Sequence, residues 1–230
     1  MQIVFLHGFA AGGAVWDQYR PEFPDALMPT LHFSDDGTAI LPELTGPAII
    51  VGWSMGGMIA VEMLRRQPQF VKGLVLISSA PSYVASDLFP EGKPLSVLHE
   101  LRDAVAQGDL KVLQDFQKQL FTPAEIRDGW LARFRRAVGP SLPTEPATLL
   151  PQLAFLEKWR TAAAELSATA PVALLHGTGD VIVDPSATMA WQQFFPQAQV
   201  KLVEAGHALP FVHHTLVSST ITLLRGSHGA

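Results

Sequence analysis

We predict from the amino-acid sequence an α/β fold: a mostly parallel sheet with helices on both faces and an inserted helical cap. The main observation is that short apolar runs alternate with segments long enough to form a helix. A second observation is that this alternation stops over a long proline-containing stretch and then resumes. The chain has 230 residues, of which 48% are hydrophobic and 16% charged, and a charged fraction below the usual ~25% favours an extensively buried sheet.

Five apolar runs are each short enough to be a strand that is buried on both faces of a sheet. They are Ile3–Leu6, Ala48–Val51, Leu74–Ile77, Val172–Leu175 and Val200–Val203. Helix-length segments lie between or after these runs, and we predict helices at Met55–Arg66, Pro185–Phe195 and Phe211–Leu224. Such alternation is typical of a parallel sheet whose crossover helices cover both faces.

The alternation of strands and helices fails between Pro81 and about Thr169. Helical stretches in this region are separated by proline-containing turns, and they are Val97–Gln107, Leu110–Leu120 and Ala124–Ala137. Because strand-like sequence resumes afterwards, we interpret residues 81–169 as a helical cap. This cap would be inserted into a core domain formed by residues 1–80 and 170–230.

Charge and composition argue against several classes of function. The net charge of −5 disfavours a nucleic-acid-binding protein, which needs a basic surface to neutralise phosphates. The chain has no cysteine, which excludes a thiolate metal site, and we expect neither a metal nor another cofactor. No apolar run approaches the roughly 18 residues of a membrane span, and a strand-like run follows Met1 where a signal peptide would lie. We therefore expect a cytoplasmic monomer with neither a membrane nor a nucleic-acid partner.

The segment Gly52-Trp53-Ser54-Met55-Gly56 lies between a predicted strand and a predicted helix. A sharp turn there holds the serine in a strained conformation at the carboxyl edge of the sheet, and glycines two residues to either side let strand and helix approach closely. A glycine and serine pattern of this length also arises by chance in such turns. Its context, and two further motifs in the required chain order, favour Ser54 as a nucleophile.

The motif His7-Gly8-Phe9 directly follows the first apolar run. The backbone N–H of Phe9, paired with that of Met55, would stabilise the negative charge that develops on a substrate carbonyl oxygen. The alternative is a simple turn that ends the strand.

A serine nucleophile needs a general base that works near neutral pH, and eight histidines compete for this role. His207 closely follows the run Val200–Val203, which places it at the same sheet edge as Ser54. The other histidines are less well placed: we expect a structural role for His7, His32 and His176, a cap position for His99, a position in the last helix for His213 and His214, and a position in the tail for His228.

The acid that orients the histidine should lie between the nucleophile and the histidine in the chain. Asp180 does so, just after the run Val172–Leu175, and its carboxylate would fix the imidazole tautomer and stabilise the imidazolium. Asp184 is the alternative, although it also has the position of an N-cap for the helix beginning at Pro185. We favour Asp180.

Together these motifs resemble the α/β-hydrolase superfamily over essentially the whole chain. Within it, the family of pimeloyl-acyl-carrier-protein methyl esterases of biotin synthesis is similar in four segments: Gly52-Trp53-Ser54-Met55-Gly56-Gly57, Ser78-Ser79-Ala80-Pro81, Phe89-Pro90-x-x-Lys93-Pro94 and His207-Ala208-Leu209-Pro210-Phe211. The resemblance implies hydrolysis of a methyl ester on a carrier-bound acyl chain, with release of methanol. It also implies a set of acyl-binding residues, namely Phe9, Ser54, Met55, Phe116, Gln117, Lys118, Gln119 and Leu120.

The chain departs from this family in four places. Most relatives have two strands before the one that precedes His7, so we expect a smaller sheet. Residues 34–47 are short for the usual helix before the nucleophile, Asp184 stands where relatives commonly have proline, and Leu209 adds a residue before Pro210. None of these differences removes a catalytic group.

Charge is unevenly distributed along the chain. Residues 99–160 contain nine Lys or Arg and eight Asp or Glu, whereas the remaining residues contain seven and thirteen. Arg127, Arg133 and Arg136 lie close together in this near-neutral region, and they would dock an acidic carrier protein; the alternative is a solvated helix face.

We therefore expect a serine carboxylesterase that forms an acyl-enzyme and acts on a small or carrier-bound ester. The same chemical groups also serve carbon–carbon bond hydrolysis and elimination in enzymes of this fold. A ligand receptor can keep the fold without catalysis, but the intact set of Ser54, Asp180 and His207 counts against that reading.

Overall fold

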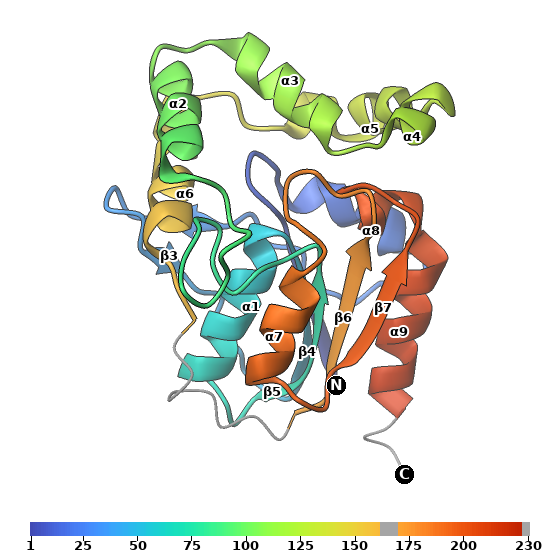
Figure 1. Cartoon of the computed structure of the whole chain (residues 1–230). Helices are drawn as coiled ribbons and strands as arrows, with labels where there is room; N and C mark the ends of the chain where they lie inside the picture. Colours follow the sequence, from blue (N-terminus) through green and yellow to red (C-terminus); the bar gives the residue numbers. More distant parts are fainter. Residues whose placement is uncertain (162–169, 227–230) are drawn as a thin grey trace.

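The computed structural model describes residues 1–161 and 170–226, and at its centre lies a parallel sheet (Figure 1). Its five strands pair in the order β1 (Gln2–Leu6), β4 (Ala48–Trp53), β5 (Val71–Ile77), β6 (Val172–Gly177) and β7 (Gln199–Val203). Every neighbouring pair is parallel. All five apolar runs predicted to be strands therefore form strands, and the predicted α/β class is confirmed. The expectation that Val200–Val203 is buried on both faces is wrong, because β7 is the last strand of the sheet and its side chains are largely exposed.

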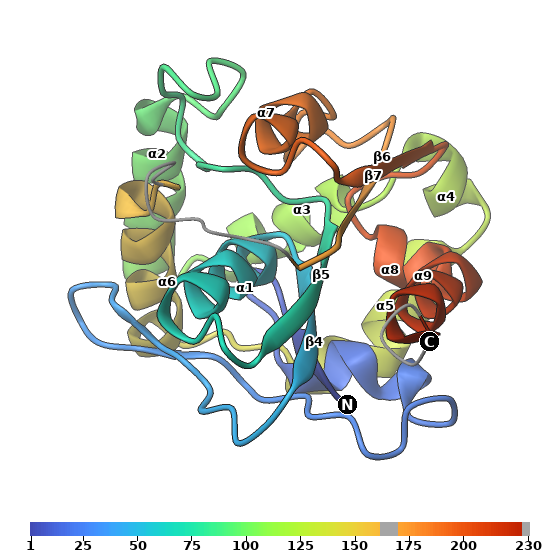
Figure 2. The same ribbon diagram turned by 90° about the horizontal axis from the view of Figure 1, so that it is seen from below.

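Helices cover both faces of the sheet, because alternate side chains of each buried strand point to opposite faces. On one face lie the 3₁₀ helix η1 (Gly13–Tyr19) and the C-terminal helix α9 (His214–Gly226). On the other lie α1 (Met55–Arg66) and α7 (Ala187–Phe194). Seen from below, the two layers lie on either side of the strands (Figure 2). No helix within the described residues is long and apolar enough to cross a membrane.

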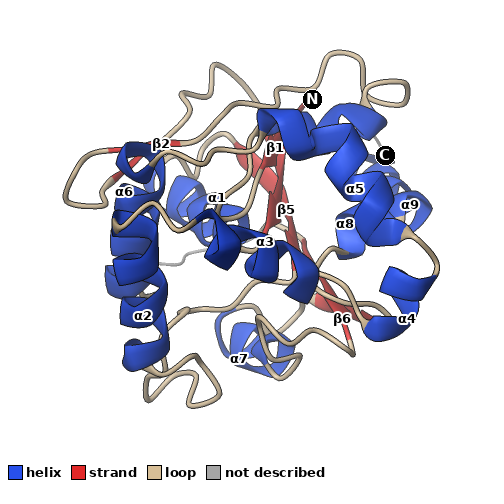
Figure 3. Ribbon diagram, turned by 90° about the horizontal axis from the view of Figure 1, so that it is seen from above, coloured by secondary structure: helices blue, strands red, loops and turns tan. Residues whose placement is uncertain are grey.

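Between β5 and β6, residues 95–158 form a series of helices that lie mainly above the carboxyl ends of the strands (Figure 1). These helices are α2 (Leu95–Ala106), α3 (Leu110–Gln119), α4 (Pro123–Arg127), α5 (Trp130–Val138), η2 (Gly139–Ser141) and α6 (Pro146–Lys158). From above, α3 crosses over the sheet, with α2 and α6 to one side of it and α4 and α5 to the other (Figure 3). The boundary predicted at residue 169 lies outside the described residues, so the division into core and cap stays a prediction.

Two predicted helices are each divided in the structure. The helix expected at Ala124–Ala137 is interrupted by Gly129, whose φ of 84° separates α4 from α5. The helix expected at Phe211–Leu224 is split into α8 (Leu209–Val212) and α9, and His213 lies between them. The prediction that His213 belongs to the last helix is therefore wrong. The predicted tail residue His228 lies outside the described residues.

The segment before β4 contains no helix among the described residues 34–47, in line with its short length. It contains part of a small antiparallel hairpin, formed by β2 (His32–Phe33) and β3 (Ala39–Ile40). Helix α6 was not predicted, because Pro151 in its interior is a residue that usually ends a helix.

Candidate active site

Ser54 lies at the sharp turn between β4 and α1, at the carboxyl end of the sheet. Its φ of 57° and ψ of −122° form a conformation that residues other than glycine rarely adopt. The Ser54 N–H donates a hydrogen bond of 2.8 Å to the carbonyl of Ile77 at the end of β5, which holds the turn in place. Ser54 thus has the strained backbone that a nucleophile turn requires.

Three glycines allow the backbone to pack closely around Ser54. A Cβ atom at Gly52 would collide with the backbone of Gly56, and one at Gly56 would collide with the carbonyl of Leu6. A Cβ atom at Gly8 would lie 3.1 Å from the Cβ of Ser54. The turn after β1 is therefore directly beside the serine, as an oxyanion site built from both turns needs.

The two backbone N–H groups predicted to bind the oxyanion border this contact. Met55 is the first residue of α1, where N–H groups have no acceptor within the helix. Phe9 follows Gly8, and its side chain is buried. The next residue, Ala10, has a φ of 51° and donates its N–H to Gln152 Oε1 of α6 at 3.1 Å, which fixes the far side of the turn.

Asp180 and His207 lie in loops that follow the neighbouring strands β6 and β7. Asp180 Oδ2 is 2.7 Å from His207 Nδ1, and both side chains are buried. The other carboxylate oxygen accepts the N–H groups of Ile182 at 2.9 Å and Val183 at 3.0 Å. Burial alone would raise the pKa of Asp180, but the charge of His207 and hydrogen bonds from the histidines hold it well below its usual value. Asp180 is therefore ionised and able to orient the imidazole.

His176 belongs to the same buried cluster, although the sequence indicated only a structural role for it. Its Nε2 lies 3.2 Å from Asp180 Oδ2 and 3.0 Å from the carbonyl of Val183. Because both partners are acceptors, Nε2 carries the proton. The four-residue spacing from Asp180 is the signal in the sequence, but the contact depends on how the chain turns after β6.

Asp184 lies apart from this cluster. It is exposed, and its Oδ1 accepts the N–H of Ser186 at 2.9 Å just before α7 begins. Hydrogen bonds from Ser186 lower the pKa of Asp184. The carboxylate that contacts His207 is thus that of Asp180. Asp184 is not the N-cap either, because α7 begins at Ala187 with Ser186 as its N-cap, two residues later than the sequence suggested.

Trp53 connects the turn at Ser54 to the loop of His207. Its Nε1 donates a hydrogen bond of 2.8 Å to the His207 carbonyl, and the two rings have centroids 5.7 Å apart. Since Trp53 directly precedes Ser54, this bond holds the histidine loop next to the serine. The hydrogen bonds of Ser54 itself are made by its backbone, and serine–histidine contacts are often long before substrate binds.

A cavity of about 310 Å³ lies between α2, α3 and the loop after β6. Phe116 and Gln119 line it together with Tyr83 and Ile182. Burial and the negative charge of Asp180 raise the pKa of Tyr83 to about 12, so its hydroxyl stays protonated. The cavity therefore adjoins the loop that carries the acid.

The five acyl-binding residues predicted in and just after α3 do not share one surface. Phe116 contacts Phe9 edge-on, with ring centroids 5.4 Å apart, and so joins α3 to the turn beside Ser54. Gln119 lines the cavity, whereas Leu120 is buried in the apolar core. The other two residues, Gln117 and Lys118, do not line this cavity.

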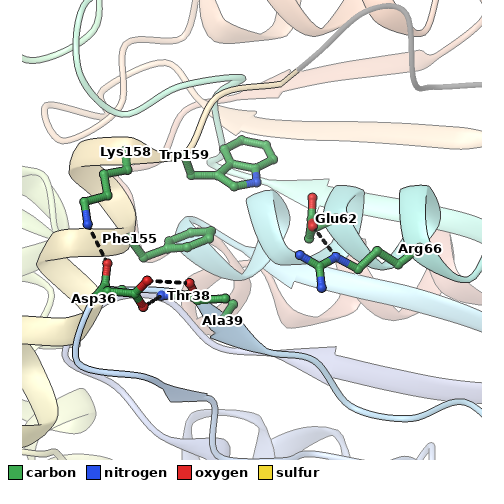
Figure 4. A pocket seen from close by; sticks show the side chains of 9 residues that line it. Asp36, Thr38, Ala39, Glu62, Arg66, Phe155, Lys158 and Trp159 are labelled. Atoms are coloured by element: carbon green, nitrogen blue, oxygen red, sulfur yellow. Dashed lines mark hydrogen bonds and ion pairs between the residues drawn. The ribbon is translucent and has the colours of Figure 1, made fainter.

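A second cavity, of about 210 Å³, lies beside the C-terminal part of α1 and the hairpin of β2 and β3 (Figure 4). Its charged groups have partners: Arg66 binds Glu62, and Lys158 Nζ donates to the Asp36 carbonyl at 2.7 Å. Helix α1 is about 18 Å long and Ser54 precedes its first residue, so this cavity lies toward the other end of the helix. Within the part of the chain that the structure describes, no group of His, Asp or Glu side chains could hold a metal ion.

His7 is buried and holds the turn after β1. Its Nε2 accepts the N–H of Leu31 at 2.8 Å, so Nδ1 carries the proton and donates to the Gly8 carbonyl at 2.8 Å. Burial lowers the pKa of His7 to about 4. The charge of His32 also lowers this pKa, whereas the hydrogen bond to Gly8 raises it. A neutral ring with both nitrogens occupied does not act as a general base for Ser54.

The three arginines of the predicted docking surface are exposed: Arg127 on α4, and Arg133 and Arg136 on α5. The guanidinium of Arg133 lies 4.7 Å from the centroid of the Trp130 ring, a cation–π contact. Arg133 and Arg136 are three residues apart and share one side of the helix. Arg135 instead donates two hydrogen bonds to α3, which tie α5 to α3.

The sequence matches the family model described as alpha/beta hydrolase fold over residues 26–214. The chain belongs to the α/β-hydrolase family. A relative from Nitrosomonas europaea, named pimeloyl-[acyl-carrier protein] methyl ester esterase, is 30% identical over 226 residues, which covers 91% of this chain and 89% of the relative. A relative of the same name from Aromatoleum aromaticum is 31% identical over 238 residues and covers 92% of each chain.

Solved structures of this α/β-hydrolase family have the same fold. An esterase from Exiguobacterium antarcticum superposes with a TM-score of 0.75 over 98% of this chain and 92% of the other, at 16% sequence identity. The predicted α/β-hydrolase fold, the predicted relatives and the predicted class of enzyme, a carboxylic ester hydrolase, are confirmed. The roles of individual residues and the identity of the ester stay predictions.

Proposed function

We propose that this α/β-hydrolase is a serine carboxylesterase, with Ser54 as nucleophile, His207 as general base and Asp180 as the acid that orients it. The observation that carries the proposal is the buried contact of 2.7 Å between Asp180 Oδ2 and His207 Nδ1. Because Nδ1 donates its proton to Asp180, Nε2 is the nitrogen left to accept a proton from the serine. The bond from Trp53 to the His207 carbonyl supports a position of this ring beside the strained turn of Ser54.

The reaction would proceed in two halves. Ser54 Oγ gives its proton to His207 Nε2 and attacks the ester carbonyl carbon, while the N–H groups of Phe9 and Met55 stabilise the oxyanion. The imidazolium then protonates the departing oxygen, the alcohol leaves, and the acyl group stays on Ser54. In the second half, water gives a proton to His207 and attacks the acyl carbon, after which Ser54 Oγ leaves with that proton and the acid is released.

The substrate we propose is a carboxylic methyl ester whose acyl chain lies in the cavity beside Phe116 and Gln119. Two observations support this class: the names of the two relatives, and the contact of Phe116 with Phe9 at the turn beside Ser54. The resemblance noted in the sequence implies a pimeloyl chain on acyl carrier protein, and hence a step of biotin synthesis. A cytoplasmic location and a monomeric state stay predictions.

The carrier protein would dock on the helices between β5 and β6, which we propose to be an inserted cap over residues 81–169. Arg127, Arg133 and Arg136 are exposed there, and none of them forms an ion pair with a described residue. An acidic partner would therefore meet free guanidinium groups on a chain that is acidic overall.

The proposal is tested by labelling with a fluorophosphonate probe and by turnover of a panel of methyl esters, both free and carrier-bound. We expect Ser54→Ala to abolish labelling, and Ser54→Ala and His207→Ala to lower ester turnover by roughly 10³-fold or more without unfolding the protein. Ser219→Ala and His213→Ala, at partly exposed or exposed positions, are the matched controls and should retain activity. Full turnover by folded Ser54→Ala protein would refute the mechanism, and activity on dicarbonyl substrates with none on esters would indicate carbon–carbon bond hydrolysis.

A further inference from the structure

The loop that carries His207 is held by the end of α3 and the first turn of α4. On one side of the histidine, the Gly206 N–H donates to both carboxylate oxygens of Glu125, at 3.1 Å and 3.2 Å. On the other side, the Ala208 N–H donates to the Leu120 carbonyl at 2.8 Å. The backbone is thus fixed by the cap immediately before and immediately after the proposed base.

Glu125 has a second role at the start of α4. Thr122 Oγ1 accepts the Glu125 N–H at 3.2 Å, and the Glu125 carboxylate accepts the Thr122 N–H at 2.7 Å, which together form a capping box. The capping box needs only the bond to Thr122. The additional bonds to Gly206 reach a residue 81 positions away and contribute nothing to the helix start.

The fit between this part of the cap and the catalytic loops leaves no space for a side chain. A Cβ atom at Gly206 would lie 2.7 Å from the Leu120 carbonyl oxygen and 2.9 Å from Glu125 Oε2. A Cβ atom at Gly179, the residue before Asp180, would lie 2.7 Å from Thr122 Cγ2. Both the acid loop and the base loop therefore rest against residues 120–125.

A buried carboxylate is costly unless its oxygens are satisfied by hydrogen bonds. Glu125 is only 7% exposed, and the donors that satisfy it are the Thr122 and Gly206 N–H groups. An apolar residue at this position would leave the buried Gly206 N–H without its partner. The loop would then shift so that water can accept the Gly206 N–H, and this shift would move His207 as well.

We propose that Glu125 is a positioning residue, whose carboxylate fixes Gly206 and through it the distance from His207 to Ser54. The inference rests on the proposed function, since it concerns the base of that reaction. It makes the cap part of the machinery that aligns the base, in addition to any role in binding substrate.

The test compares Glu125→Ala with Thr122→Val, which loses the capping hydroxyl but keeps Cγ2 against Gly179 and leaves Glu125 bonded to Gly206. Both variants should lower the melting temperature. Glu125→Ala should lower kcat for a small p-nitrophenyl ester by about tenfold to a hundredfold with little change in KM, and slow fluorophosphonate labelling equally, because the base is displaced. Thr122→Val should keep both rates within about twofold.

Glu125→Gln is the conservative variant and keeps the protein foldable. Its single amide oxygen can replace Oε2 and accept from both Thr122 and Gly206, but its NH₂ group cannot accept the second bond from Gly206, so its kcat should fall between those of wild type and Glu125→Ala. In an amide hydrogen-exchange measurement, Gly206 should lose most protection in Glu125→Ala, lose less in Glu125→Gln and keep it in Thr122→Val.

Two results would overturn the proposal. One is an equal loss of kcat in Glu125→Ala and Thr122→Val at equal loss of melting temperature, which would reduce Glu125 to a helix cap. The other is unchanged Gly206 protection in folded Glu125→Ala, a readout that does not depend on catalysis. Failure of the proposed function would show differently, as wild-type turnover that Ser54→Ala retains.

Discussion

The carboxylate of Asp180 lies 2.7 Å from the imidazole of His207, although 27 positions separate the two residues in the chain. The contact follows from the topology: β6 and β7 are parallel neighbours, so the loops that leave their carboxyl ends meet at one edge of the sheet. The second oxygen of Asp180 is held by the N–H groups of Ile182 and Val183, which leaves Oδ2 directed at the histidines.

Replacement of the acid should distinguish Asp180 from Asp184. Asp180→Asn places an amide against His207 Nδ1, where it favours the wrong tautomer, and we expect turnover of a methyl ester to fall about 10³- to 10⁴-fold. Asp184→Asn keeps a side-chain oxygen that can accept the Ser186 N–H in the turn before α7. Steady-state kinetics should therefore show near-normal turnover for Asp184→Asn, and the reverse ranking would move the proposed acid to Asp184.

Close backbone approach at the nucleophile turn gives a prediction about stability. A Cβ atom at Gly56 would collide with the carbonyl of Leu6. This Cβ atom would be fixed to the backbone and its partner is a backbone group, so the two cannot move apart as easily as a flexible side chain can. We expect Gly56→Ala to lower the free energy of unfolding by about 3 kcal/mol or more in urea titration. Gly46→Ala is the control, because nothing lies within 4 Å of its Cβ position, and it should change stability by less than about 1 kcal/mol. Equal losses in the two variants would contradict the close-packing argument.

The sequence predicts most clearly the strands in which every residue is buried. A strand buried on both faces of a parallel sheet must be apolar throughout, so runs such as Ala48–Val51 are visible without knowledge of their neighbours. Ser54 and Asp180 follow two such strands, whereas His207 follows the largely exposed strand β7, and chain order together with the strand ends is enough to propose all three. The fold class and the candidate triad therefore come from local patterns.

Features that depend on distant parts of the chain are not visible in the sequence. Glu125 and Gly206 are 81 positions apart. The spacing of Thr122 and Glu125 in the sequence indicates a capping box, but it does not indicate the contact with Gly206. The break at Gly129 was missed because a single glycine within a helical pattern is often tolerated, and here its positive φ ends α4. Helix α6 was missed because Pro151 masks it.

Burial of His7 predicts a loss of stability in mild acid. Its pKa is about 4 in the folded protein and 6.5 in the unfolded chain, so the unfolded state binds the extra proton between these values. The contribution of His7 to the free energy of unfolding is fully present above pH 6.5 and is lost as the pH falls toward 4. The free energy of unfolding should change by at most about 1.4 kcal/mol per pH unit because of this residue. Urea unfolding of wild type and His7→Gln across this pH range should show that the free energy of unfolding changes less with pH in the variant. Parallel curves would mean that another group causes the slope.

Docking of an acidic carrier is tested by charge reversal on α5. Arg133→Glu combined with Arg136→Glu removes two exposed guanidinium groups from one side of the helix, so KM for a carrier-bound ester should rise by about tenfold. A small free ester should be hydrolysed as before, since neither side chain lines the cavity beside Phe116. The matched control is Lys201→Glu with Arg225→Glu, which changes the net charge equally on β7 and α9, away from the cap, and should leave KM for the carrier-bound ester near its original value.

Salt dependence separates charge attraction from damage to the cap in the Arg133 and Arg136 variant. The preference of wild type for the carrier-bound ester should weaken as ionic strength rises, because exposed charges are screened over about 10 Å at 0.1 M salt. The double variant should show little salt dependence, having lost the charges that attract the carrier. Equal loss on free and carrier-bound esters would mean that α5 was disrupted, since a docking surface affects only the substrate that docks. No effect on either ester would exclude docking at this site while leaving the esterase proposal intact, because Ser54 and His207 act on the ester group itself.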